Sequence, residues 1–468
     1  MALVGVVADD LTGAMDTGVQ FRKSGMSTMV YPDASSIEGL RSLVEDNGHD
    51  VVVANTDTRN SAPDVAYARV GSVCSEFRAA EVGRMYKKMD STLRGNIGRE
   101  LDAAIDAWGA RVACVAPAFP ELGRVTVGGC QLLNGAPVDA TEMAEDVLSP
   151  VRNAHLPTLL AAGSCRKVGQ VALDIVRQGS DAVARRLHEA ADQGFEVLVF
   201  DAETQRDLDD IAAGIVGAEL AALMCGSAGL ALGLIRALDL RKPNLAGSPR
   251  AAAHVPHVPR VSHAPSCGPT LVVSGSRSQT TQAQIEQLKS SLGAAHFSVG
   301  FAELKAAAEV ADAFAPSDDA GLSTLLARMS QVLAAGRDVV ISVSSNLHWR
   351  EIVGTEVTAA DDLIRAKQGM SDTIVLGLGG VVKRLLEFAH VCSIVLTGGD
   401  TAAAVCKQLK VPRLALIDEI LPGMPVATVA GGPYDGLTMV TKAGAFGGDD
   451  ALVHVLRYLK NRAEGDVD

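Results

Sequence analysis

The chain has 468 residues, of which 48% are hydrophobic and 4% aromatic, and its formal net charge at pH 7 is −13. This length predicts two or three domains, and the composition is typical of a soluble α/β protein. The negative charge argues against a general nucleic-acid or membrane binder, because those partners require a basic surface. No apolar run reaches membrane-spanning length and the first residues lack a signal-peptide pattern, so we expect a cytoplasmic protein.

The first half of the chain alternates short apolar runs with longer periodic stretches. Apolar runs without alternation, typical of strands buried on both faces, occur at residues 3–8, 51–54, 112–116, 197–200 and 221–224. A helical pattern at 181–191 separates two of these runs. Strands that alternate with helices predict a mainly parallel sheet covered by helices, so we expect an α/β domain over residues 1–245.

Two acids, Asp9 and Asp10, directly follow the first predicted strand. They stand at its carboxyl end, where open α/β sheets bind ligands. Neighbouring side chains on an extended chain point in opposite directions. One carboxylate is therefore expected to face a ligand while the other caps the following helix, and a purely capping role for both is the alternative.

The densest polar cluster of the chain is KKMDSTLRGN, residues 87–96. An apolar stripe with helical spacing begins at Ile97, which predicts a helix whose N-cap is Asn96. The cluster is thus expected in the loop before this helix, where free backbone N–H groups favour an anion. Its candidate ligand-binding residues are Lys88, Asp90, Ser91, Thr92 and Arg94.

Two other strand-end loops carry an arginine. Arg59 ends the stretch NTDTR, and Arg124 lies in APAFPELGRVT. Arginine is the residue best suited to bind a carboxylate through two parallel hydrogen bonds. Because the carboxyl ends of parallel strands lie at one edge of a sheet, these loops together predict a pocket for a small, hydroxylated, anionic molecule.

A proline-rich segment, 246–268, predicts a linker to a second α/β domain over residues 269–468. Its strand-like runs, at 271–273, 339–343, 394–397, 426–429 and 437–441, lead into loops rich in glycine or serine. Small residues let backbone N–H groups approach phosphate oxygens, so these loops predict a nucleotide site. The candidates are Ser274, Ser276, Gly398, Gly399, Asp400, Thr401, Gly431, Gly432 and Gly444. The P-loop pattern is absent, and GLGGVV at 377–382 lacks the third glycine of the dinucleotide fingerprint.

Taken together, these motifs resemble the four-carbon acid sugar kinase family. The matching stretches run in order along both domains: VVADDLTGAMDTG, NTDTR, KKMDSTLRGNIGREL, APAFPELGR, CGSAGLA, SGSRS, TGGDTAA, LPGMPVATVAGG and KAGAFG. The resemblance implies ATP-dependent phosphorylation of threonate, erythronate or a 3-oxo-tetronate. It also implies that the N-terminal domain binds the acid, that the C-terminal domain binds ATP, and that the active site lies in the cleft between them. One departure is Asp146, which is followed by Val147 where family members tend to show Asp-Pro.

The resemblance suggests roles for the candidate residues. Arg59 and Arg94 are expected to grip the substrate carboxylate, while Asp9, Asp10, Asp90 and Ser91 bind its hydroxyls. Mg2+ is expected on the phosphates, with Asp400 assigned to the metal side. Asp10 is preferred over Asp9 as catalytic base, on the expectation that Asp9 is held by local backbone bonds and that repulsion raises the pKa of one of the pair. A loose transition state that needs only positioning is the alternative.

Two other functions stay open at this stage, an NAD-dependent sugar-acid dehydrogenase and a non-catalytic two-lobed binding protein. The incomplete dinucleotide fingerprint counts against the first, and the glycine-rich loops count against the second. Neither nucleic acid nor membrane is expected as a partner, and a homodimer is compatible with the sequence.

Overall fold

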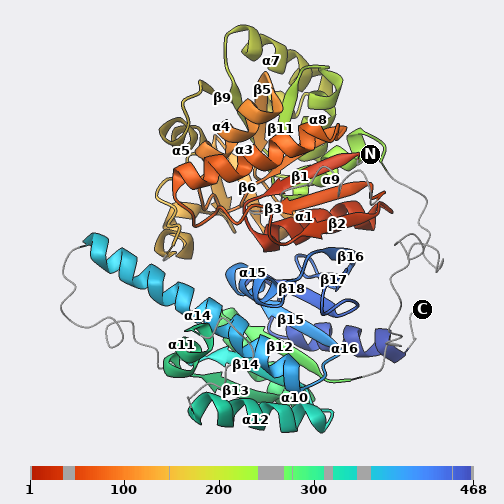
Figure 1. Cartoon of the computed structure of the whole chain (residues 1–468). Helices are drawn as coiled ribbons and strands as arrows, with labels where there is room; N and C mark the ends of the chain where they lie inside the picture. The colour runs from red at the N-terminus through yellow and green to blue at the C-terminus, as the bar shows by residue number, and fades with distance from the viewer. Residues whose placement is uncertain are drawn as a thin grey trace. The chain divides into compact units, whose positions relative to one another are not determined.

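The computed structural model describes residues 3–34, 48–146, 148–240, 268–276, 278–309, 320–344, 360–444 and 446–464. The chain divides into two compact units, Met1–Val255 and Pro256–Asp468, which are coloured red to green and green to blue in Figure 1. The boundary between them falls inside the predicted linker. That linker, 246–268, lies outside the described residues except for residue 268.

Unit 1 is built on a parallel sheet whose strands are hydrogen-bonded in the order β2-β3-β1-β4-β11-β5-β10-β9. The strands are β1 (Val4–Ala8), β2 (Thr28–Tyr31), β3 (Val51–Asn55), β4 (Arg84–Lys88), β5 (Val112–Ala116), β9 (Val168–Val171), β10 (Val197–Phe200) and β11 (Ala222–Gly226). The direction in which the chain winds reverses at β1, which lies between β3 and β4. A reversal of this kind is the usual ligand-binding position of open α/β sheets.

The helices of unit 1 pack in two groups. One group contains α3 (Pro63–Ala79), α4 (Ile97–Trp108) and α5 (Leu156–Gly163). The other contains α1 (Leu11–Lys23), α7 (Ser180–Asp192), α8 (Gln205–Gly217) and α9 (Ala228–Ala237), and the short α6 (Leu173–Val176) packs against α7 and α8. A small antiparallel sheet of β6 (Arg124–Val127), β7 (Cys130–Leu133) and β8 (Ala136–Pro137) follows β5.

Unit 2 has a mixed sheet in the order β13-β14-β12-β15-β18-β17-β16. Its parallel strands are β12 (Thr270–Ser274), β13 (Ala295–Val299), β14 (Val339–Val343), β15 (Ser393–Thr397) and β18 (Thr438–Lys442). At one side, β17 (Pro425–Val429) and β16 (Leu414–Glu419) are antiparallel. The helices are α10 (Gln279–Leu292), α11 (Phe301–Glu309), α12 (Ala320–Ala334), α14 (Ala360–Phe388), α15 (Gly399–Gln408) and α16 (Ala451–Glu464).

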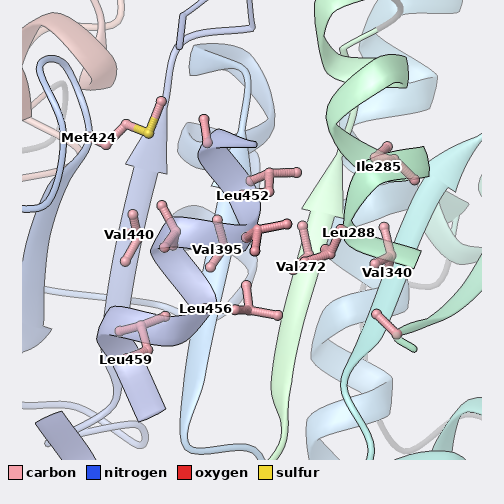
Figure 2. Close-up of a cluster of buried hydrophobic side chains, with 14 of the residues drawn as sticks. Val272, Ile285, Leu288, Val340, Val395, Met424, Val440, Leu452, Leu456 and Leu459 are labelled. Atoms are coloured by element: carbon pink, nitrogen blue, oxygen red, sulfur yellow. The ribbon is translucent and has the colours of Figure 1, made fainter. Parts of the chain in front are cut away.

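One buried cluster of unit 2 lies between its sheet and the helices α10 and α16 (Figure 2). Along α16, Leu452, Leu456 and Leu459 recur at helical spacing and form one buried face. They pack against valines that share one face of the sheet, Val272 and Val395 among them. This packing fixes the parallel strands whose ends carry the serine and glycine loops.

The predicted fold class, two α/β domains with mainly parallel sheets, is confirmed. The predicted strands 112–116, 197–200 and 339–343 coincide with the observed ones, and the others agree to within two residues. β4 was not predicted, because RMYKK holds three basic residues and so lacks the apolar run of a buried strand. The strands β2, β9, β13 and β16 and the small antiparallel sheet were not predicted either.

Candidate functional site

Three polar loops of unit 1 lie next to one another, at the carboxyl ends of the neighbouring strands β3, β1 and β4. Ala8 is paired with Asn55 on one side and with Lys88 on the other, so β3, β1 and β4 end side by side. The loops that follow these strands carry the predicted acids and arginines. The expectation that they share one edge of the sheet is therefore correct.

Arg59 lies at the centre of this cluster. Its Nε donates to Asp9 Oδ2 at 2.7 Å, while Nη1 and Nη2 donate to the two carboxylate oxygens of Asp10 at 2.8 and 2.7 Å. Asp90 Oδ1 lies 3.8 Å from Nη2. Gly95 makes this arrangement possible, because its φ of +97° suits glycine and any side chain there would press on Arg59. All three guanidinium nitrogens are thus engaged by the protein's own acids.

Of the two adjacent acids, it is Asp10 and not Asp9 whose side chain makes the local backbone bond. Asp10 is the N-cap of α1, and its Oδ1 accepts from Gly13 N at 2.9 Å. Asp9, expected to be held by backbone bonds, is instead held by Arg59, and its Oδ1 is buried without a hydrogen-bond partner. Burial by itself raises the pKa of Asp9, but Arg59, Lys87 and Lys88 lower it below the ordinary value. The expectation that repulsion raises a pKa in this pair is therefore wrong for Asp9.

Asp90 and Arg94 form a second ion pair in the loop after β4. Arg94 donates to the Asp90 carboxylate through Nε at 2.8 Å and Nη2 at 3.3 Å, and Thr92 Oγ1 donates to it at 2.5 Å. Burial favours protonation of Asp90, but Arg94 and Arg59 hold its pKa well below the usual range. Arg94 Nη1 also lies 3.4 Å from Asp146 Oδ2. Asp146, the residue followed by Val147 where family members tend to show proline, is therefore part of the cluster.

Lys87 and Lys88 were expected in a loop. They are instead the last residues of β4, and both are almost fully buried. Lys87 pairs with Glu100 of α4 at 2.7 Å. The Nζ of Lys88 donates to Met89 O at 2.6 Å. A Cβ at Gly13 would lie 3.0 Å from this Nζ, so the lysine packs closely against the start of α1. In the sequence, two adjacent lysines are typical of a solvated loop. Only the pairing of β4 within the sheet shows that their side chains are buried.

The small antiparallel sheet supports the Ser91 side of the cluster. Gln131 of β7, which the sequence analysis did not single out, donates from Nε2 to Ser91 O at 2.7 Å. Its Oε1 accepts from Thr126 Oγ1 at 2.6 Å. Asn96 precedes α4 as expected but makes no capping bond, because its amide donates to Thr58 O and Ser61 O instead.

In unit 2 most of the predicted nucleotide residues come together. Ser274, Thr397 and Lys442 end the adjacent strands β12, β15 and β18, so the loops that follow them share one edge. A side chain at Gly444 would collide with Ser276 Oγ, and one at Gly275 would collide with Thr401 Oγ1. The edge therefore gathers Ser274, Ser276, Gly398, Gly399, Asp400, Thr401 and Gly444, with Asp400 exposed in the first turn of α15.

Gly431 and Gly432 do not belong to this group. They follow β17, which is antiparallel to β18, so they lie at the opposite edge of the sheet. Their φ values of +88° and +74° serve the turn between the two strands. The structure therefore does not bring Gly431 and Gly432 together with the other candidate residues, because β17 runs in the opposite direction to β18.

Lys442, which the sequence analysis also missed, is fully buried at the end of β18. Its Nζ donates to Ala443 O at 3.0 Å and to Gly444 O at 2.9 Å.

No cluster of three or more His, Cys, Asp or Glu side chains that could hold a metal occurs among the described residues. Within the same ranges, no helix has both the length and the apolar character needed to cross a membrane.

Comparison with known proteins divides the chain at the same place. Residues 4–234 match the model of a sugar-binding N-terminal domain, and residues 271–452 match that of a nucleotide-binding C-terminal domain. The chain is 30% identical to the D-threonate kinase of Salmonella typhimurium, over 98% of this chain and 99% of that protein. It is 32% identical to the D-threonate kinase of Bordetella bronchiseptica, over 98% of each.

A D-erythronate kinase of Heliobacterium modesticaldum is 29% identical, over 100% of this chain and 99% of that protein. Among solved structures, a Salmonella typhimurium LT2 protein superposes with a TM-score of 0.68, covering 97% of this chain and 99% of its own. At 22% identity, that likeness shows a common fold.

Proposed function

The chain belongs to the four-carbon acid sugar kinase family and is a phosphotransferase that uses ATP and a four-carbon sugar acid, and we propose that unit 1 binds the acid at the ends of β1, β3 and β4. Unit 2, in this proposal, binds ATP at the ends of β12, β15 and β18. The observation that carries the proposal is the cluster of Asp9, Asp10, Arg59, Asp90 and Arg94, which offers both acceptors for hydroxyls and cations for a carboxylate.

Asp9 is the residue we propose to orient the attacking hydroxyl. Its Oδ1 is a buried carboxylate oxygen without a partner, and an unsatisfied buried acceptor costs about 1–3 kcal/mol. A substrate hydroxyl would be the missing donor. Both oxygens of Asp10 are already bonded, to Arg59 and to Gly13 N, which leaves Asp10 to fix the start of α1.

In the reaction, the acceptor oxygen bonds to the γ-phosphorus as the bond from that phosphorus to the bridging oxygen of ATP breaks. The hydroxyl proton passes to Asp9 as the new bond forms. Because the pKa of Asp9 is lowered, the carboxylate is ionised at neutral pH and can accept this hydrogen bond. A loose transition state needs little further covalent help from the protein.

The substrate carboxylate is proposed to bind Arg94 rather than Arg59. Arg59 is committed to Asp9 and Asp10, and its side chain is 12% exposed. Arg94 is 26% exposed, and its Nη1 contact with Asp146 is long, at 3.4 Å. A substrate carboxylate can replace the weak Asp146 contact while Asp90 keeps Arg94 in place. Lys88, Ser91 and Thr92 complete the proposed substrate contacts.

Mg2+ is proposed to bind with the nucleotide. Mg2+ in kinases usually takes one or two protein carboxylates and completes its shell with phosphate oxygens and water. A single exposed acid in the first turn of α15, Asp400, fits that pattern. When bound, the ion would neutralise part of the phosphate charge. The position of the active site between the two domains and a homodimer stay predictions.

The test is ADP release from ATP with Mg2+ over a panel of D-threonate, D-erythronate and 3-oxo-tetronate. We expect at least one of these acids to be phosphorylated, and the ratio of kcat/KM values will rank them. Failure of every four-carbon acid would contradict the proposal. Thermal stabilisation by NAD but not by ATP would instead favour the dehydrogenase alternative.

A further inference from the structure

The chain buries two lysines at the ends of parallel strands, and they differ in how their charge is balanced. Lys87, at the end of β4, pairs with the carboxylate of Glu100 at 2.7 Å, and its pKa is raised although burial by itself lowers it. Lys442, at the end of β18, contacts only carbonyl oxygens among the described residues. Burial lowers the pKa of Lys442 to about 8.

The elements packed against β18 do not supply a buried counter-charge. β15 (SIVLT) and β17 (PVATV) contain no ionisable side chain. On α15 the ionisable side chains are Asp400 and Lys407, which are exposed, and Cys406, a buried thiol whose pKa is raised by burial and which is therefore neutral. Helices α10 and α16 pack on the face of the sheet that carries Val440. Among their described side chains the one carboxylate is Glu286, which is exposed and bonded to Lys289, and the other ionisable groups are Lys289, His454, Arg457, Tyr458, Lys460 and Arg462. A buried charge is normally paired with an opposite one, so an ammonium in this position calls for an anion that the described residues do not supply.

Lys442 is connected to each loop of the candidate nucleotide edge. Its carbonyl accepts from Gly398 N at 2.8 Å, at the start of α15. Its Nζ donates to Gly444 O, which also accepts from Thr281 Oγ1 at 2.7 Å and from Ser278 Oγ at 3.2 Å. These hydroxyls belong to the start of α10, after β12. The lysine therefore lies where the three loops join.

We propose that Lys442 is a positioning residue for the nucleotide, which holds the loop after β18 through Ala443 O and Gly444 O and supplies the positive charge that balances the phosphate groups. The inference rests on the ATP site proposed for unit 2. Nucleotide binding is then coupled to protonation of Lys442. Phosphate charge favours the ammonium form, so the pKa of Lys442 rises on binding. Below pH 8 the lysine is already charged, and above pH 8 binding must take up a proton.

The first experiment measures the Kd of ATP, ADP and adenosine by calorimetry on the full chain between pH 6.5 and 9.5. For ATP and ADP we expect a constant Kd up to about pH 7.5 and then a rise approaching tenfold per pH unit above pH 8. Adenosine carries no phosphate, so its Kd should not change. A flat profile for ATP, or the same rise with adenosine, would overturn the inference.

The second experiment replaces the charge. Lys442→Met keeps the length of the side chain, and we expect it to weaken ATP about tenfold or more at pH 7 and to remove the rise above pH 8. Lys407→Met, an exposed lysine on the neighbouring α15, is the matched control and should leave both unchanged. A Lys442→Met profile parallel to that of the unmodified protein would show that another group titrates, and would refute the assignment.

Different results would contradict the proposed function and the role of Lys442. If ATP does not bind at pH 7 and no acid elicits ADP release, the proposed function is wrong and this inference falls with it. If ATP binds and is consumed with a pH-independent Kd, the function stands and only the role of Lys442 is lost.

Discussion

Unit 1 and unit 2 place their candidate sites at the same position, the carboxyl ends of parallel strands, but with different chemistry. In unit 1 the side chains carry the charge, and Asp9, Asp10 and Asp90 are matched by Arg59 and Arg94 through short hydrogen bonds. In unit 2 the edge presents hydroxyls and glycines above one buried lysine. The difference teaches that one sheet architecture can present either charged side chains or backbone groups at the ends of its strands, and we propose that the first suits a small acid and the second a phosphate chain.

The largest effect is expected from removing the centre of the unit 1 cluster. Arg59→Leu removes the cation that is hydrogen-bonded to both Asp9 and Asp10, and breaking a buried ion pair costs about 3–5 kcal/mol. We expect ADP release to fall to background and Tm, measured by calorimetry, to fall by on the order of 10 °C. Arg59→Lys should not restore activity, because one ammonium cannot reproduce the bonds to both acids.

Arg111→Leu is the control for Arg59, because it removes an exposed ion pair with Asp192. Exposed pairs contribute at most about 1 kcal/mol, so Tm should change little. An equal loss of Tm in both variants would mean that the cluster has no special energetic weight.

The next effect separates the two adjacent acids. Asp9→Asn should lower kcat by about a hundredfold with little change in the KM of the acid, because the amide cannot accept the hydroxyl proton. Asp10→Asn should cost much less, since asparagine is also a good N-cap. Steady-state kinetics of both variants decide the matter, and a larger kcat loss for Asp10→Asn would reverse the assignment.

A smaller effect tests the backbone character of the unit 2 site. Gly444→Ala places a methyl group against Ser276 Oγ, and such overpacking costs about 1–3 kcal/mol. We expect the KM of ATP to rise about tenfold while the KM of the acid stays unchanged. Gly431→Ala strains a turn at the opposite edge and should leave both constants as they are. A matching rise in that variant would mean that the opposite edge also contributes to ATP binding.

The smallest effect concerns acid pH and stability. The pKa values of Asp9 and Asp90 are lowered in the folded state, so their contribution is complete above the unfolded value near 4 and is lost as pH falls through the folded values. Asp90→Asn should therefore lower Tm by a few degrees at pH 7, with the difference shrinking below about pH 4. A difference that stays constant down to pH 3 would contradict the lowered pKa of Asp90.

Local sequence was sufficient for strands that are apolar along their whole length, but not for β4, which buries two lysines. An unbroken apolar run is typical of a strand covered on both faces, which is why 112–116 and 339–343 could be located from their residues alone. It was also sufficient to group Asp9, Arg59, Asp90 and Arg94, because parallel strands send their ends to one edge.

The tertiary structure decided what depends on partners distant in sequence. Asp9 and Asp10 have the same chemistry, and it is Arg59, which follows a different strand, that leaves one Asp9 oxygen unsatisfied while binding both oxygens of Asp10. The direction of β17 is not encoded in its own residues, so Gly431 and Gly432 could not be separated from the other glycines. Lys87 and Lys442 look alike in the sequence, and only the packed sheet shows that both are buried and that, among the described residues, Lys87 alone of the two pairs with a carboxylate.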